Sequence, residues 1–337
     1  MTEGAAMGWR GGGAGLSRRA VRAGAGVGAE GRGGAWTSFA GAARGHWRGV
    51  QATFSGAGTA QEVPSIYVPE AFREWGGGLH DWQTHCEVGC GEPPTCGMSV
   101  TVRRLVPLAA CESINIETVD ENYTVLRTDV EKNLGEAKTV LPDGSYSAGT
   151  RELERDRSWR IEHCFATGDG ERVRVIQLVS HSEYAGGWIA KTLEMDTEER
   201  LPSPPGPDED PLDGRVVVDD RVFATSEPLR PEEATGADGR VWGGFRGSLF
   251  QVSEGRFFLE GEDVEAAEAA KCPLSPASAG VVGLPLGAYS RVEQASDGAV
   301  VLEAGVVRAE VRAFSRRLYE GADLLLTQVV LGSETAA

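Results

Sequence analysis

Short segments of alternating polarity, separated by glycine- and proline-containing turns, recur along this 337-residue chain and constrain its fold more than any other feature. In SWRIEHCF, residues 158–165, the side chains of Trp159, Ile161 and Phe165 fall on one face of an extended segment, as a half-buried strand requires. A Gly-Asp-Gly turn at 168–170 leads into ERVRVIQLV, which is rich in β-branched residues. These two segments are predicted to form a β-hairpin.

Comparable turn sequences occur at 142–144, 297–298 and 320–322, and the last two separate strand-like segments on either side. Only VEAAEAAK, residues 264–271, has a clear helical pattern. Many short strands with almost no helix favour closed antiparallel sheets. The sequence therefore predicts an all-β protein made of two β-barrels in tandem.

The two ends of the predicted first barrel are marked by changes in composition. Residues 1–39 are rich in glycine, alanine and arginine and poor in acidic residues, which resembles an organelle transit peptide; the alternative is a disordered extension. Residues 196–213, DTEERLPSPPGPDEDPLD, contain five prolines and seven acidic residues, as expected of an interdomain linker or a long solvated loop. We therefore expect barrels at 40–195 and 214–333.

The formal net charge of -17 bears on the choice of partner. An acidic surface repels a phosphate backbone, so nucleic acid is not an expected target. The charge leaves two readings open, a well-solvated exterior and a surface that docks on basic proteins. No apolar run reaches the length of a membrane span.

Motifs with catalytic or cofactor-binding chemistry are missing from this sequence. It has no P-loop, no nucleophile elbow and no paired histidines of a zinc enzyme. The glycine pattern at 26–31 matches a dinucleotide fingerprint only in its letters, because no strand precedes it. His163 falls on the apolar face of its strand and is expected to be a core histidine. We therefore expect no enzyme activity, no catalytic residues, no cofactor and no bound metal.

The cysteines at 86, 90 and 96, with His85 beside them, leave three readings open. They could bind zinc, although the paired Cys-x2-Cys spacing of structural zinc sites is missing. They could form a disulfide between neighbouring members. They could also be incidental thiols in a loop.

Gly45-His46-Trp47 opens the first strand-like segment after the leader and is similar to the Gly-x-Trp signature of lipocalins and their calycin relatives. The longer runs 49–86, 284–305 and 316–334 resemble the tandem-calycin family of cyanobacteria, algae and plants. That family includes the biogenesis factor for the chloroplast ATP synthase. The resemblance covers most of residues 43–333.

The resemblance implies structural roles for five residues of the first barrel. Gly45 and Trp47 form the strand signature, and Trp75 and Trp82 are expected to close the barrel. Cys86 matches the end of the family's DWQTHC run, whereas Cys90 and Cys96 lie in a divergent part.

The resemblance also implies a function. It predicts a non-enzymatic protein of the chloroplast stroma, in which two barrels joined by a spacer transiently bind the β and γ subunits of the ATP synthase head. A different reading is a lipocalin-like carrier or lyase for a small apolar ligand such as a fatty acid, a carotenoid or a bilin. A third is an enzyme that uses His163 or His181.

Overall fold

The fold is given by a computed structural model of the whole chain. It describes residues 29–68, 74, 78–92, 98–105, 123–128, 137–168, 170–203, 223–234, 242–246, 248–253, 256–258, 262–264, 280–308 and 311–334. Within these residues the chain is built from two antiparallel sheets with few helices, so the all-β prediction is confirmed.

The first sheet has 11 strands in the order β12-β11-β5-β6-β7-β8-β9-β1-β2-β3-β4. Its first strand, β1, is hydrogen-bonded to both its successor β2 and the much later β9. Strands β1 to β9 therefore follow the cyclic order of an up-and-down barrel that is open between β4 and β5. The strands are β1 (Gly45–Ser55), β2 (Asp81–Cys90), β3 (Met98–Leu105), β4 (Tyr123–Thr128), β5 (Ala137–Val140), β6 (Tyr146–Gly149), β7 (Ser158–Gly168), β8 (Glu171–Ser182), β9 (Gly187–Arg200), β11 (Ser248–Ser253) and β12 (Arg256–Phe258).

The second sheet has seven strands in the order β13-β10-β18-β17-β16-β15-β14. Here too an early strand, β10, pairs with the last strand, β18. The second sheet thus repeats the first-with-last pairing of the first. Its strands are β10 (Trp242–Arg246), β13 (Glu262–Val264), β14 (Val281–Gly283), β15 (Ala288–Gln294), β16 (Val300–Val307), β17 (Val311–Glu320) and β18 (Asp323–Glu334).

The predicted hairpins are confirmed, and their turns use the expected glycines. β7 and β8 pair through the turn at 168–170, and β15 pairs with β16 across Asp297-Gly298. Gly170 and Gly298 both have positive φ, which glycine adopts without strain. The alternation of polarity in the sequence therefore located these strands correctly.

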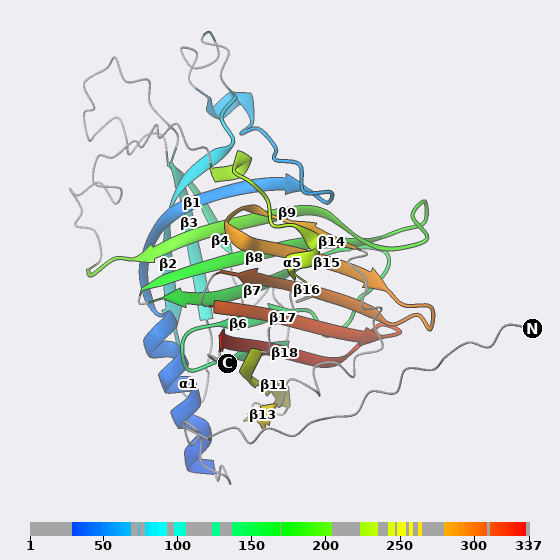
Figure 1. Ribbon diagram of the computed structural model, residues 1–337. Helices are drawn as coiled ribbons and strands as arrows, with labels where there is room; N and C mark the ends of the chain where they lie inside the picture. Colours follow the sequence, from blue (N-terminus) through cyan, green and yellow to red (C-terminus); the bar gives the residue numbers. More distant parts are fainter. Residues whose placement is uncertain are drawn as a thin grey trace, which may run out of the picture.

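Helices are few among the described residues. The longest is α1 (Ala29–Ala43), and the others are α5 (Pro231–Ala234) and the 3-10 turns η1 (Ser65–Tyr67), η2 (Phe223–Thr225) and η3 (Pro285–Gly287). No described helix combines the length and the apolar character needed to cross a bilayer. Helix α1 runs across the predicted boundary between the leader and the first barrel, and it packs against the strands of the first sheet (Figure 1). The helix expected at 264–271 lies outside the described residues, apart from Val264 at the end of β13.

Two features differ from the predicted domain boundaries. Strand β9 continues to Arg200, so residues 196–200 belong to the first sheet and not to a linker. Of the acidic residues in this stretch, Asp196 and Glu198 are buried on one face of the strand, whereas Glu199 is exposed on the other, and composition alone does not show this. Strand β11, from the second half of the chain, pairs with β5, and β12 pairs with β11, so both extend the first sheet.

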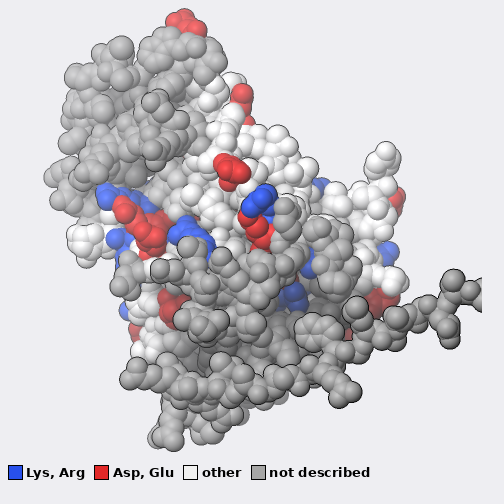
Figure 2. Space-filling model, viewed as in Figure 1, with Lys and Arg blue, Asp and Glu red and all other residues white. Residues whose placement is uncertain are grey.

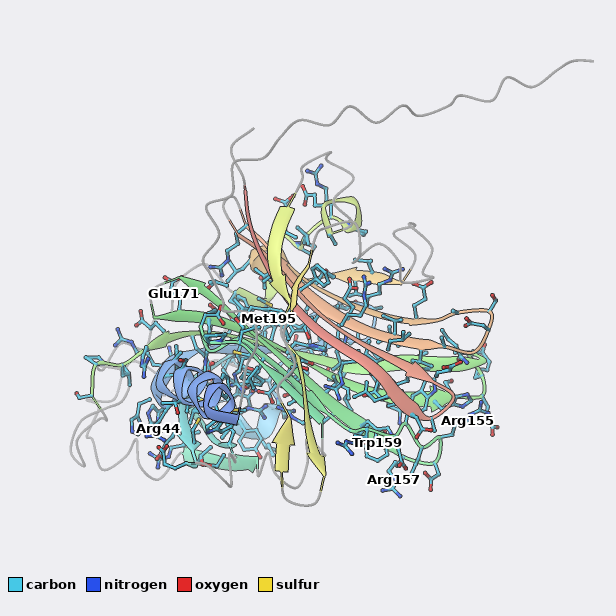
Figure 3. All side chains as sticks on the ribbon, turned by 90° about the horizontal axis from the view of Figure 1, so that it is seen from below. Arg44, Arg155, Arg157, Trp159, Glu171 and Met195 are labelled. Carbon is cyan, nitrogen blue, oxygen red and sulfur yellow. The ribbon has the colours of Figure 1, made fainter. Side chains whose placement is uncertain are left out.

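The two sheets pack directly on each other, and their shared core includes Met195 and Leu193 of β9 with Ala304 and Val306 of β16. In Figure 3, Met195 lies near the middle of the molecule, where the green strands of the first sheet meet the orange strands of the second. The expectation of two barrels joined by a spacer is therefore incomplete, because a common apolar layer also joins the sheets.

A buried polar contact fixes how the two sheets meet. The side-chain amide of Gln177 on β8 donates to Ser290 Oγ at 2.8 Å and to the backbone carbonyl of Glu303 at 2.9 Å, both in the second sheet. Its amide oxygen lies 3.4 Å from Nε2 of His163. Buried amides require such partners, so this contact favours one relative position of the sheets.

Candidate functional site

The concave face of the first sheet, turned away from the second sheet, is the candidate site. One end of this face is apolar and is covered by α1. Trp36 and Phe39 of the helix are 2% and 0% exposed, and they pack with Met98, Val140 and Tyr146 of the strands. The space between helix and strands is too narrow for a water molecule, whereas small-molecule pockets usually measure about 300–1,000 Å³. Helix α1 therefore fills this end of the barrel.

The carboxyl end of α1 is fixed by Arg200, the last residue of β9. Its guanidinium donates to the carbonyls of Ala42 and Gly41, each at 3.2 Å, and to the carbonyl of Arg44. These carbonyls have no partner within the helix, and a cation there also complements the helix dipole. Figure 3 shows Arg44 at this end of the helix. The helix is thereby held to β9.

Gly45 begins β1 beside the same arginine. Its φ is 136°, in the region that favours glycine. A Cβ atom at this position would lie 3.4 Å from Nε of Arg200. The signature glycine therefore allows the chain to pass from α1 into β1 next to the Arg200 side chain.

Trp47 lies between two guanidiniums. Arg172 of β8 stacks over its ring at 3.9 Å from the centroid, and Arg200 lies at 5.6 Å. The indole N–H donates to the carbonyl of Ala43 at 3.2 Å. Cation–π stacking is strongest when the cation is desolvated, and Arg172 is only 3% exposed. Trp47 therefore separates the apolar end of the concave face from a charged layer.

The charged layer is centred on Arg174. This guanidinium forms a two-point contact with Glu198, with Nε–Oε2 and NH2–Oε1 both at 3.0 Å, and it donates to Glu162 Oε1 at 3.1 Å. Asp196 Oδ1 lies 3.3 Å from the same guanidinium. Glu198 also accepts from Arg172 at 2.6 Å. Alternation along β7, β8 and β9 places all these side chains on one face.

Three less buried residues extend this layer into a closed ring of polar contacts. Arg104 of β3 donates to Gln51 and lies 3.9 Å from Glu194. Glu194 also pairs with Arg160 of β7 at 3.1 Å. The ring is completed by the contacts Arg160–Glu162, Glu162–Arg174, Arg174–Asp196 and Asp196–Gln51.

Exposure increases along the concave face with distance from α1. The side chains of Arg104, Glu194 and Arg160 are 19%, 25% and 26% exposed, whereas those of the central layer are at most 4% exposed. Leu178, opposite Arg160 on β8, is 37% exposed. The ring residues Arg104, Glu194 and Arg160, together with Leu178, are called here the outer group. Solvent therefore reaches the concave face from the outer group.

Three buried polar atoms on this face have no hydrogen-bond partner within the described residues. They are Oδ2 of Asp196, Oγ1 of Thr84 and Nε of Arg160. Native proteins pair most buried polar atoms, and an unpaired one calls for a specific explanation, such as a ligand or an ordered water. The face therefore offers both a donor and acceptors to a bound molecule.

The pKa values follow from burial and from this pairing. Burial by itself raises the pKa of Glu198, but Arg172 and Arg174 together bring it below its usual value. Burial raises the pKa of Asp196 to about 6, and Arg174 opposes the rise only in part. Burial likewise raises the pKa of the Tyr146 hydroxyl, which donates to Glu162.

The structure places the sequence-predicted residues in different surroundings. Gly45, Trp47 and Cys86 lie together on β1 and β2, and Trp47 pairs directly with Cys86 across the strands. Trp82 is 5% exposed and packs with Val63 and Val68, at the end of β2 away from α1. Trp75 lies outside the described residues, so its expected role is not tested.

His163 is a buried core histidine, as predicted. It lies 3.4 Å from both Ser147 Oγ and Gln177 Oε1. Burial lowers its pKa to about 3. It faces the second sheet and takes no part in the concave site.

The structure bears on the three interpretations given above for the cysteines at 86, 90 and 96. Cys86 is a buried free thiol that accepts from Arg172 at 3.4 Å, so a disulfide between Cys86 and Cys90 is ruled out. Burial raises the pKa of Cys86 well above its usual value, which makes the thiol unreactive. Cys96 lies outside the described residues. Within the described ranges, no three His, Cys, Asp or Glu side chains meet as a metal site requires.

Sequence reasoning missed the charged layer. From the sequence, ERVRVIQLV is predicted as a strand and DTEER as part of a linker or loop, without a role for their charged residues. The signal was the strict alternation of Arg172 and Arg174 with valines, and of Asp196 and Glu198 with residues of the opposite face. Only the pairing of β8 with β9 shows that these charges oppose each other inside a barrel.

No family model matches the chain, and no curated protein sequence matches it significantly. One solved structure, of a DUF3598-family protein with unknown function from Nostoc punctiforme, is 14% identical with a TM-score of 0.47, covering 89% of this chain and 98% of that one. Another, the S-type phycobiliprotein lyase CpeS from Guillardia theta, is 16% identical with a TM-score of 0.27, covering 50% of this chain and 94% of that one. The tandem-calycin family stays a prediction, and neither structure bears on the function of this chain.

Proposed function

We propose that this protein is a lipocalin-like binding protein whose first barrel takes a small amphipathic ligand that carries an acid group. The observation that supports this proposal is the outer group, where two partly exposed arginines both lie next to Glu194, and Arg160 also contacts the buried Glu162. The acid group of the ligand would pair with Arg104 and Arg160, because charge-assisted pairs with guanidinium are strong in a partly desolvated site.

Apolar side chains, most of them partly buried, lie next to these arginines. Arg104 stacks on Trp82 at 5.7 Å, and Trp82 packs with the half-buried side chains of Tyr67 and Leu79. Leu178 is exposed beside Arg160. An apolar body with one acid group matches this combination, since binding sites pair apolar walls with a few placed polar groups.

The proposal can be tested with defined probes. Tryptophan quenching would follow the binding of cis-parinaric acid, a fluorescent fatty acid, and of its methyl ester, which has the same apolar body without the charge. The wild-type protein should bind the acid more tightly than the ester. Arg104→Gln and Arg160→Gln should each weaken binding of the acid by about tenfold, the value of one charge-assisted hydrogen bond, and leave the ester unchanged.

Arg48→Gln is the matched control, because Arg48 pairs with Glu199 on the opposite face of the same sheet. It should bind both probes as the wild type does. The proposal fails if the wild type binds neither probe, or if Arg48→Gln weakens binding as much as the other two changes.

Two expectations from the sequence remain predictions beside this proposal. Binding to ATP synthase subunits and residence in the chloroplast stroma rest on the family resemblance and on the composition of residues 1–39. Pull-down with isolated β and γ subunits would test the first, and imaging of a fluorescent protein fused to residues 1–39 would test the second. The proposed role is binding, and no reaction step is assigned to any residue.

A further inference from the structure

The fully buried part of the charged layer has one more carboxylate than guanidinium. Arg172 and Arg174 face the carboxylates of Glu162, Asp196 and Glu198, and all five residues are at most 3% exposed. Arg160, at the edge of this group, also lies 3.7 Å from Glu162, and a buried charge without a full partner is costly.

The contacts show which carboxylate carries the surplus. Glu198 pairs with both guanidiniums, and Glu162 accepts from Arg174 and from the Tyr146 hydroxyl. Asp196 uses only Oδ1, which accepts from Gln51 at 2.9 Å and lies 3.3 Å from Arg174. Its Oδ2 has no partner in the described part of the chain.

Asp196 also lies directly below the outer group. It is two residues from Glu194 on β9, and Gln51 bridges it to Arg104. A ligand whose acid group binds Arg104 would therefore be separated from Asp196 by the Gln51 side chain alone in this chain of contacts.

We propose that Asp196 recognises a hydrogen-bond donor, an N–H or O–H, on a ligand that also carries an acid group, and that it binds a proton in mildly acidic solution when no ligand is present. This inference rests on the proposed function, which it deepens by naming the second group of the ligand. The unpaired oxygen and the surplus charge are the observations that carry it.

The surroundings of Asp196 agree with this role. From β8 it faces Arg174 and Arg172, from β1 Gln51, and along β9 the carboxylates of Glu194 and Glu198. The charged groups further along the face are Glu162 and Arg160 on β7 and Arg104 on β3. Burial, with the two neighbouring carboxylates, raises the pKa of Asp196 to about 6 despite Arg174.

The first test needs no ligand. The folded protein takes up a proton at Asp196 below about pH 6, whereas the unfolded chain does so only near pH 3.9. Stability from this proton is therefore present at low pH and is lost as the pH rises through 6. Asp196→Asn has no such loss. The difference in Tm between this variant and the wild type should therefore increase by about 3 °C in favour of the variant as the pH is raised from 5 to 8.

Asp156→Asn is the control for this test, because the Asp156 side chain is 78% exposed. Its Tm relative to the wild type should not change with pH. A Tm difference for Asp196→Asn that is constant between pH 5 and pH 8 would overturn the assignment of the surplus charge to Asp196.

The second test compares two acid probes, cis-parinaric acid and biliverdin, a linear tetrapyrrole with carboxylates and pyrrole N–H donors. Asp196→Asn should weaken the binding of biliverdin by at least about tenfold at pH 8 and leave the binding of cis-parinaric acid unchanged. The affinity of the wild-type protein for biliverdin should fall as the pH is lowered from 8 to 5. The affinity of Asp196→Asn for biliverdin should fall less over the same range.

The outcomes separate the two proposals. If the wild type binds neither probe, the proposed function and the donor recognition both fail. If both probes bind and Asp196→Asn changes neither affinity, the proposed function stands and the role of Asp196 is overturned.

Discussion

At the scale of single residues, the interior of the first barrel is organised by charge pairing rather than by apolar packing alone. Trp47 and Cys86 were found from the sequence because a local motif marks them. Arg172, which contacts both residues, was not found from the sequence, because it lies on β8 and is far from them along the chain. Local patterns predict which face a residue is on, but not which residues of other strands oppose it.

Glu198 should be the most sensitive residue of the charged layer. Glu198→Gln leaves Arg172 and Arg174 without their common carboxylate, and breaking a buried pair typically costs about 3–5 kcal/mol. Its neighbour Glu199 is 55% exposed and pairs with Arg48, so Glu199→Gln should cost less than about 1 kcal/mol. Urea unfolding of both variants measures this difference. Equal losses would contradict the description of a buried layer.

His163 should make the protein sensitive to acid. Burial lowers its pKa to about 3 in the fold, whereas the unfolded chain binds a proton near pH 6.5. Its contribution is therefore present above pH 6.5 and is lost as the pH falls toward 3. His163→Gln should reduce the stability lost between pH 7 and pH 4 by on the order of 2 kcal/mol. His181→Gln, in a partly exposed position, is the control, and an unchanged acid profile for His163→Gln would contradict this account.

At the scale of elements, the amino-acid composition of α1 does not indicate the helix that the structure shows. Its sequence AEGRGGAWTSFAGAA is rich in glycine and gives no clear helical signal. The helix is stabilised by tertiary contacts, namely the burial of Trp36 and Phe39 and the contacts of Arg200 and Trp47 with its last carbonyls. A leader removed after residue 39 would therefore take with it two aromatic side chains of the core.

Phe39→Ala tests this role of α1. Phe39 is fully buried and packs edge-on against Tyr146 at 6.1 Å between ring centroids. Removing a buried phenyl ring typically costs about 3–5 kcal/mol, while Ser38→Ala, at the exposed neighbouring position, should be nearly neutral. A chain that begins at residue 29 should be as stable as the full chain, and one that begins at residue 40 should be less stable, both measured by thermal unfolding. Equal stability of the two truncated chains would contradict a structural role for α1.

At the scale of the whole molecule, the two sheets pack directly against each other. They share the apolar layer around Met195, and β11 crosses from the second half of the chain into the first sheet. The sequence could not show that the two sheets share a core, because the contacts lie between segments more than a hundred residues apart. Figure 2 shows positive and negative side chains next to each other on the described part of one face, which argues there against a wide single-sign docking surface.

The shared core predicts cooperative unfolding. Calorimetry of the full chain should show a single transition, because neither sheet can lose its partner without exposing the residues of the common layer. Two separate transitions would contradict this account and favour two independent barrels on a spacer.

The central claim is that the concave face of the first sheet binds an amphipathic acid beside Arg104 and Arg160. A crystal structure of the full chain with cis-parinaric acid tests it most directly. The account predicts the carboxylate of the probe within about 3 Å of one or both guanidiniums, with its chain against Trp82 or Leu178. A probe bound to the second sheet or to the outer surface, with the ring of polar contacts unchanged, would contradict it.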